Sequence, residues 1–320
     1  MIAKESDILF FYDAIDNNPN GDPFTNLPRY DVSTKRAAVS DVRIKRYIRD
    51  QINQQNKFLP KEEKEDLYIV PISIQDYIDV FGKEPKKMSG AAARTEILLE
   101  KYKKDPLIFS GKNPNIRALL LKCLDCRLFG GISTEKNQNI AITGPVQFNK
   151  LNYSLNKVEL RPFQNTSVLQ SDIATKKQGA IGTTHIISYA LFQIYGHLTE
   201  AIAQDTNLTE EDFSKMIRAL WNAINHTKTT SKMGQHSLLF LRIIYKEPFN
   251  IIYNIDDSII CKKENIARSF KDLELNFSIF KEIVNKKSDL IEEIQYKTVN
   301  PELDLIIKDT CTNIKYKAID

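Results

Sequence analysis

The 320-residue chain has few cysteines, few histidines and no long apolar run. Its four cysteines are too few for a disulfide-stabilised scaffold. No stretch approaches the roughly 20 apolar residues of a membrane helix, so no membrane partner is expected. The N-terminus places acids ahead of a short apolar run, which makes a poor signal peptide. These absences predict a cytoplasmic protein, and 42% hydrophobic residues are enough to form a substantial core.

Motifs that carry chemistry are also scarce. Cys123 and Cys126 form a CxxC pair, but a zinc site needs four ligands. Cys261 and Cys311 stand alone, and the four histidines show no ligand spacing. Gly-Gly at 130–131 is not followed by the Gly-Lys-Ser/Thr of a phosphate-binding loop, and no Ser/His/Asp signature stands out. The sequence therefore predicts structural cysteines and no cofactor, metal ion or catalytic residue.

Four aspartates near the end of the first predicted strand leave one catalytic alternative open: Asp13, Asp16, Asp22 and Asp31. Paired carboxylates there could hold Mg²⁺ for phosphodiester cleavage. Aspartate also caps turns routinely through its side chain, and no acid–histidine pairing supports a metal site. The pattern favours turn capping.

Positive charge is concentrated in one short segment. Between Arg29 and Arg49 there are seven Lys/Arg and two acids, a local charge of +5, although the whole chain carries only +4. Such a local field is typical of a site for a polyanion. The segment also contains Lys35, Lys45 and Arg46.

Local patterns predict how this segment folds. Asp7 to Ala14 is apolar, aromatic and short, which indicates a strand. The Asn/Pro/Gly/Asp cluster at 17–23 then predicts turns. A helix begins at residue 39 or 40, with Ser40 as N-cap, and runs to about Asn53. One face of this helix packs on a core, so its cations are expected to point outward.

The rest of the chain predicts one elaborated α+β domain without repeats or a clean linker. Helices are expected at about 89–103 and 115–127, and a capping box at 209–212 opens another amphipathic helix. Strands are expected at 141–148, with a break at Gly144-Pro145, and at 186–198 and 237–245. Residues 149–182 lack a helical period and fit a long hairpin or arm with Lys176, Lys177 and Gln178 near its tip, and such segments are usually functional.

Together these features predict a protein that binds the backbone of a nucleic acid. Lysine and arginine neutralise phosphates without reading sequence, and Asn18, Asn20 and Arg29 lie close to the basic helix in the chain. There is no RNA-recognition signature with stacking aromatic residues.

Several ordered motifs resemble a known family. The chain reads N-P-N-G-D-P at 18–23, L-P-R-Y-D at 27–31, D-V-R-I-K-R at 41–46, C-R-L-F-G-G at 126–131 and T-G-P-V-Q at 143–147. A late His-Thr turn at 226–227 and the strand at 237–245 continue the match. The sequence resembles the CRISPR-associated Cas-seven family, the backbone subunit of type I Cascade, and is closest to its type I-B and I-C branches.

The resemblance implies an RRM-like (ferredoxin-like) antiparallel sheet with helical insertions at 57–112 and 199–228 and a thumb hairpin at 163–184. It implies that copies of the chain line up along a CRISPR guide RNA with other Cascade subunits and present the guide to target DNA, without enzymatic activity. The alternative is an RNA endonuclease like the related type III subunits, with one of the four aspartates as catalyst. The RNA-binding residues then expected are Asn18, Asn20, Arg29, Lys35, Lys45, Arg46, Arg49, Lys176, Lys177, Gln178 and Met233.

Overall fold

The computed structural model describes residues 1–84, 90–109, 111, 113–135, 138–166, 181–262, 266–309 and 314–319. Within these residues, no helix combines the length and the apolar character needed to cross a membrane. The expected arm residues Lys176, Lys177 and Gln178, and Cys311, lie outside the described part of the chain.

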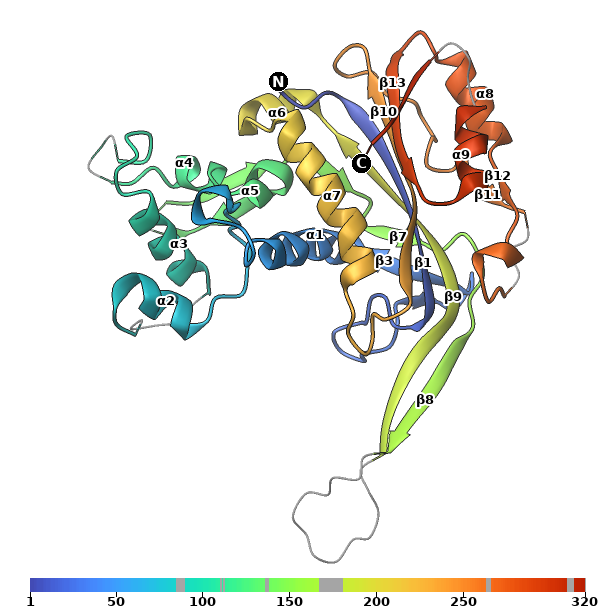
Figure 1. Ribbon diagram of the computed structural model, residues 1–320, viewed down its shortest axis with the longest axis horizontal. Coiled ribbons are helices and arrows are strands. Elements are labelled where there is room, and N and C mark those ends of the chain that lie inside the picture. Colours follow the sequence, from blue (N-terminus) through green and yellow to red (C-terminus); the bar gives the residue numbers. More distant parts are fainter. Residues whose placement is uncertain are drawn as a thin grey trace, which may run out of the picture.

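A mostly antiparallel sheet forms the centre of the molecule (Figure 1). Its strand order is β14 (Lys315–Ala318), β13 (Ile291–Thr298), β10 (Gln235–Tyr245), β1 (Ser6–Asn17), β9 (Ile181–Leu198) and β6 (Val146–Phe148). β8 (Leu160–Thr166) also pairs with β9. β1 is central and antiparallel to both neighbours, whereas β14 is parallel to β13. The fold is therefore mixed α+β.

The central strand is buried on both faces, which explains its continuous apolar sequence. Phe10 and Tyr12 point to one core together with α1 (Asp41–Gln55) and α7 (Glu210–His226). Leu9 and Phe11 point to a second core together with α8 (Ser278–Lys286) and α9 (Pro301–Lys308). This alternation follows from the two-residue period of a strand.

Smaller elements surround the sheet. A three-stranded sheet contains β2 (Tyr30–Asp31), β3 (Arg36–Ser40) and β7 (Leu151–Tyr153), and β4 (Gly130–Ser133) pairs with β5 (Ile140–Thr143). A separate helical lobe contains the 3-10 turn η1 (Lys61–Glu63), α2 (Ile74–Phe81), α3 (Gly90–Lys101), α4 (Ile116–Leu121) and α5 (Leu124–Phe129). The remaining elements are α6 (Glu200–Thr206), β11 (Ile260–Cys261), η3 (Phe270–Asp272) and β12 (Leu275–Asn276).

Most predicted elements are confirmed, with one helix divided. The first strand extends to Asn17, Ser40 caps α1, and Thr209 and Asp212 form the predicted capping box. The helix predicted at 115–127 is instead α4 and α5, because Cys123 has an extended backbone (φ −87°, ψ 128°) and becomes the N-cap of α5. An extended residue cannot continue the helical hydrogen-bond ladder.

The predicted arm begins as a hairpin of β8 and β9 that projects from the body of the molecule (Figure 1). The pairing runs from Leu160 opposite Ile187 to Thr166 opposite Ile181. β9 is 18 residues long and continues from this hairpin into the central sheet beside β1. One strand therefore belongs both to the arm and to the core.

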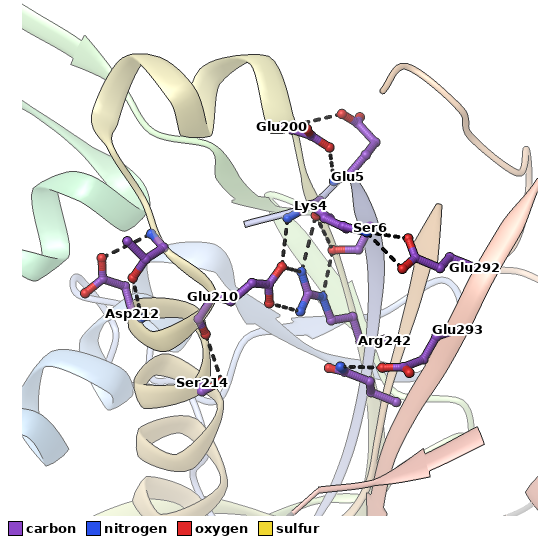
Figure 2. A network of polar contacts seen from close by, with 12 residues as sticks. Lys4, Glu5, Ser6, Glu200, Glu210, Asp212, Ser214, Arg242, Glu292 and Glu293 are labelled. Atoms are coloured by element: carbon purple, nitrogen blue, oxygen red, sulfur yellow. Dashed lines mark hydrogen bonds and ion pairs between the residues drawn. The ribbon is translucent and has the colours of Figure 1, made fainter. Parts of the chain in front are cut away.

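A buried arginine joins α7 to the sheet. Arg242 on β10 is 1% exposed, and its guanidinium donates to both carboxylate oxygens of Glu210 at 2.6 and 3.0 Å. It also donates to the Ser6 hydroxyl at 3.0 Å and the Lys4 carbonyl at 3.3 Å (Figure 2). The Lys4 amide donates to Glu210 at 2.8 Å. These bonds fix the start of α7 against β1 and β10.

Candidate nucleic-acid interface

The turn cluster after β1 is tied to the start of α1. The Asn20 side-chain oxygen accepts from Arg29 Nε and from the Ser40 amide, each at 3.1 Å, in the amide orientation that satisfies both donors. The Ser40 hydroxyl in turn accepts from the Arg43 amide at 3.4 Å. The Asn20 carbonyl also accepts from the Arg29 amide at 3.0 Å. Asn20 is buried, so it positions Arg29 and the helix.

Arg49 does not point outward, which corrects the expectation for this helix face. Its side chain is 9% exposed, and Nε donates to Asp125 Oδ2 at 2.8 Å. The same carboxylate accepts the backbone amides of Tyr68 at 2.7 Å and Ile69 at 3.0 Å. Arg49 therefore fastens α1 to α5 and to segment 68–69. In this conformation its guanidinium is engaged inside the protein.

Lys45 and Arg46 are each paired on the helix itself. Lys45 is 13% exposed and lies 3.2 Å from Asp41 Oδ2 and 3.1 Å from Gln147 Oε1. The expectation that it points outward is therefore also wrong. Arg46 is exposed, and its Nε donates to both Asp50 oxygens at 2.8 Å. An exposed pair of this kind contributes little stability, so Arg46 can exchange Asp50 for another anion.

Three other expected contact residues, Arg29, Lys35 and Met233, are at least partly exposed. Lys35 is exposed in the turn between β2 and β3, with a left-handed backbone (φ 59°). Arg29 is partly exposed and lies 3.8 Å from Asp22. Met233 is 63% exposed, and its carbonyl accepts from Asn17 Nδ2 at 2.9 Å. Gly234 follows with φ 87°, where a Cβ would lie 2.6 Å from the Ile15 carbonyl. Only glycine permits this close approach.

Two cations meet here without a carboxylate partner among the described residues: Arg43 and Lys232. Lys232 Nζ donates to the Asn18 carbonyl. The Arg43 guanidinium lies over the Tyr47 ring at 3.8 Å, and its Nε is buried without a hydrogen-bond partner. Burial, together with the nearby Arg43 charge, lowers the pKa of Lys232 to about 8. A bound anion would offset both the burial of the Lys232 ammonium and its repulsion by Arg43.

Lys232 lines an open cavity of about 600 Å³ at the root of the arm. Asn18 and Asn26 come from the turn cluster, and Phe163 from β8. The cavity is further lined by the hydroxyl residues Thr229, Thr230 and Ser231. Loop 229–232 and the turn cluster are far apart in sequence, yet the Asn18 amide donates to the Ser231 carbonyl at 3.1 Å. The cavity thus offers hydroxyls, the Lys232 ammonium and the Phe163 ring. His185 and Asp16 also line it, and the Asp16 carboxylate is paired with Arg268.

The four aspartates have structural partners. Asp22 accepts from the Phe24 and Thr25 amides at 3.0 and 3.1 Å, and Asp31 accepts from the Ser33 amide at 2.8 Å. Turn capping is thereby confirmed for these two.

The other two aspartates pair with cations or histidine. Asp16 forms a bidentate pair with Arg268 at 2.9 and 3.1 Å. Asp13 lies 2.9 Å from His236 Nδ1, and burial raises its pKa. Across the part of the chain with assigned coordinates, no group of three metal-binding side chains gathers.

The cysteines of the CxxC pair are core residues, as predicted. Cys123 and Cys126 are both fully buried in the helical lobe. Burial raises the pKa of each thiol, so neither is activated as a nucleophile.

Sequence reasoning missed Lys232 as a site residue. It is a single lysine within T-T-S-K-M-G, far from the basic segment. The polar loop before a buried strand was its only local signal. Arg43 was visible as a helix cation, but its pairing with Lys232 depends on the sheet bringing β10 beside β1.

The chain is similar to known proteins along most of its length. The family model of CRISPR-associated protein Cas7 matches residues 4–278. A Cas7 protein from Haloferax volcanii is 28% identical over 91% of this chain and 86% of its own length. Two similar solved chains carry the titles CRISPR RNA-guided surveillance complex, pre-nicking (TM-score 0.55, 12% identity, 99% of this chain and 96% of that one) and CRISPR RNA-guided surveillance complex (TM-score 0.50, 11% identity, 99% and 94%). At these identities the solved chains share the fold. Because the family model spans most of its length, the chain belongs to the CRISPR-associated Cas7 family.

Proposed function

We propose that this protein binds the phosphate backbone of a CRISPR guide RNA and acts as a repeated backbone subunit of an RNA-guided surveillance complex. The observation that carries the proposal is Lys232, a partly buried cation that has no carboxylate partner among the described residues, lines a polar cavity and feels the charge of Arg43. Phosphate is the anion that a nucleic acid supplies at such a site. Membership of the Cas7 family and the titles of the similar solved chains support the same assignment.

In this proposal a guide phosphate lies between Arg43 and Lys232, next to the hydroxyls of Thr229 and Thr230 in the cavity. Arg29, Lys35 and Arg46 extend the positive surface along the turn cluster and α1. Met233 and the arm residues Lys176, Lys177 and Gln178 are proposed to contact the RNA from the other side. Asn18, Asn20 and Arg49 act by positioning these groups, since their side chains are buried.

The core is proposed to be an RRM-like variant of the ferredoxin-like fold. Chain order β1, α1, β6, β9, α7, β10 combines with the spatial order β10-β1-β9-β6, and both helices cover one face. This is the order of a split βαβ unit. The single domain at 1–320 would carry an insertion at 57–112 and the arm at 163–184, which would close over the guide. The expected insertion at 199–228 would be reduced to the short helix α6, because α7 is one of the two core helices.

We further propose a type I complex in the cytoplasm, in which several copies and other Cascade subunits present the guide to target DNA. The chain would act without catalysis of its own. The engagement of Asp22, Asp31 and Asp16 in turns and an ion pair supports this, because a metal-dependent nuclease needs carboxylates free to bind its cations.

The first test compares Arg43→Ala/Lys232→Ala with the native protein. We expect single-stranded RNA binding to weaken roughly 10- to 100-fold, and the slope of log affinity against log salt concentration to fall by about 1, since the phosphate between the two cations is no longer neutralised. Lys286→Ala/Lys287→Ala, at the last residue and the C-cap of α8, removes the same charge at a different helix and serves as control. Equal affinities for the two double variants would contradict the proposed site.

The second test concerns catalysis. The assembled complex is incubated with RNA complementary to its guide and Mg²⁺, and the products are separated by size. We expect intact RNA. Periodic cuts that disappear in Asp13→Ala or Asp16→Ala would instead establish the endonuclease alternative.

A further inference from the structure

The segment between β10 and β11, residues 246–259, is an irregular loop with a fixed position. Ile252, Ile255 and Ile259 are buried in the core below it. The Ile252 amide donates to the Tyr245 hydroxyl at 3.0 Å, and Gln193 donates to the Asp256 carbonyl. These anchors hold the loop against the sheet, so the direction of its remaining side chains is defined.

The loop presents aromatic side chains to solvent. Phe249 is 76% exposed and Tyr253 is 81% exposed, with Ile251 between them at 38%. Phe249 has φ 66° and Asn254 has φ 60°. A left-handed backbone is costly for a bulky residue, and such strain concentrates at functional positions. Exposed aromatic residues on a rigid loop are the usual anchors of a protein interface.

The charge of this loop identifies the kind of partner. Glu247, Asp256 and Asp257 outnumber Lys246, which gives the loop a net charge of −2. Like charges would repel the phosphates of a nucleic acid. The loop therefore fits a protein surface that combines an apolar floor with a positive rim.

The same chain carries such a surface on its helical lobe. An open cleft of about 730 Å³ lies between the end of α1 and α3, and Leu67, Val70 and Ile97 are among its apolar lining residues. Five lysines or arginines and three acids line it, a net charge of +2.

The acids of this cleft are already engaged. Asp66 is bonded to Lys101 at 2.6 Å, Glu65 is bonded to Lys215 at 2.7 Å, and Asp76 accepts from the Ser73 amide at 2.7 Å. Lys57 and Lys61 are exposed at the rim. The nearby Glu62 and Glu63 line a neighbouring cavity instead.

We propose that the 246–259 loop of one copy docks into this cleft of the next copy, with Phe249 and Tyr253 on the apolar floor and the loop acids against the rim lysines. The loop follows β10 and the cleft lies beside α3, well apart on the molecule (Figure 1). Two different surfaces would therefore meet, and such a contact builds an open row of copies when the rotation between neighbours does not close into a ring. The inference rests on the proposed function for the presence of repeated copies.

Cross-linking in the guide-bearing complex tests this contact. Asn53, exposed in the cleft, and Tyr253 are both replaced by Cys in a Cys311→Ser background, and a short bismaleimide is added. Cys123, Cys126 and Cys261 are buried and leave little background. We expect a ladder of cross-linked multimers. In the matched control, Leu305→Cys on α9, which is 68% exposed, replaces Asn53→Cys and is expected to give no ladder.

The same samples are assayed for co-purified RNA, which separates the two proposals. RNA-bearing complexes without a ladder, or cross-linking of position 253 to a different subunit, would refute the docking contact and leave guide binding intact. Loss of RNA from all samples would count against the proposed function itself.

Charge reversal is a second test of the contact. Lys57→Glu/Lys61→Glu is expected to shorten the assemblies, and adding Glu247→Lys/Asp257→Lys to the same chain is expected to restore their length. Absence of rescue would also overturn the contact.

Discussion

At the scale of single residues, the proposed contact of Lys232 with a phosphate predicts that RNA binding depends on pH. Its pKa is about 8 in the free protein, because burial and Arg43 disfavour the charged form. A bound phosphate favours that form, so affinity should fall as pH rises from 7 to 9, by up to about tenfold per unit of pKa restored on binding. Fluorescence anisotropy with single-stranded RNA at constant ionic strength measures this.

Lys232→Arg is the matched control for that titration. Arginine keeps its charge throughout this range, so the variant should bind RNA with a nearly flat pH profile. A native profile as flat as that of the arginine variant would show that Lys232 does not meet the phosphate.

Arg242 is predicted to be the most sensitive charged residue for stability. Arg242→Ala leaves Glu210 partly buried without its partner and removes the bonds to Ser6 and Lys4, which should lower the free energy of unfolding by roughly 3–5 kcal/mol. Urea denaturation measures the change. Glu210→Ala introduced into the Arg242→Ala variant should lower the free energy of unfolding much less than Glu210→Ala introduced into the native protein, because the two residues act as a unit. Additive losses would contradict this coupling.

The sequence predicted some residue roles correctly and others wrongly, and the distance along the chain to the partner residue explains the difference. The roles of Ser40 as N-cap and of Asp22 as a turn cap depend on neighbours within a few positions, so the local sequence was enough to predict them. Arg49 was misjudged because its partner Asp125 lies 76 positions away. A helical face predicts which side chains share a side, but not whether a second element covers that side.

At the scale of elements, α1 links the sheet to the helical lobe through Arg49. Arg49→Ala should destabilise the protein by roughly 3 kcal/mol, because Asp125 would remain buried and only partly satisfied. Arg46→Ala, three residues earlier, should change stability by no more than about 0.5 kcal/mol, since its pair is exposed. Thermal unfolding of the two single variants makes the comparison, and similar losses would show that burial does not decide the effect.

The elements themselves were largely predictable where one pattern dominates. The apolar stripe and capping box of α7 and the apolar run of β10 are local signals. The break between α4 and α5 at Cys123 was not predictable, because the residues on both sides of it are compatible with one continuous helix. The break depends on how the helical lobe packs. The RNA-binding roles of the arm residues remain predictions.

At the scale of the whole molecule, His197 makes stability depend on pH. Its ring nitrogens lie 2.7 Å from Asp7 and 2.8 Å from Glu5, which join β9 to the start of β1. Although burial alone would lower the pKa of His197, the two carboxylates raise it above its ordinary value. The stabilisation is therefore complete below the unfolded pKa near 6.5 and is lost as pH rises through the folded pKa.

Denaturant unfolding between pH 6 and 9 tests this prediction. The native protein should lose free energy of unfolding across the range relative to His197→Gln, which cannot titrate. Parallel curves for the two proteins would assign the pH dependence to other groups.

The central position of β1 has a consequence for how the protein is made. β1 is synthesised first, yet its neighbours β9 and β10 begin at residues 181 and 235. Pairings of such long sequence separation form slowly. The ribosome must therefore release most of the chain before the strand acquires either neighbour, and Arg43 and Lys232 cannot meet earlier. An unfinished polypeptide would therefore lack the proposed anion site, and we expect that only molecules synthesised beyond β10 can bind RNA there.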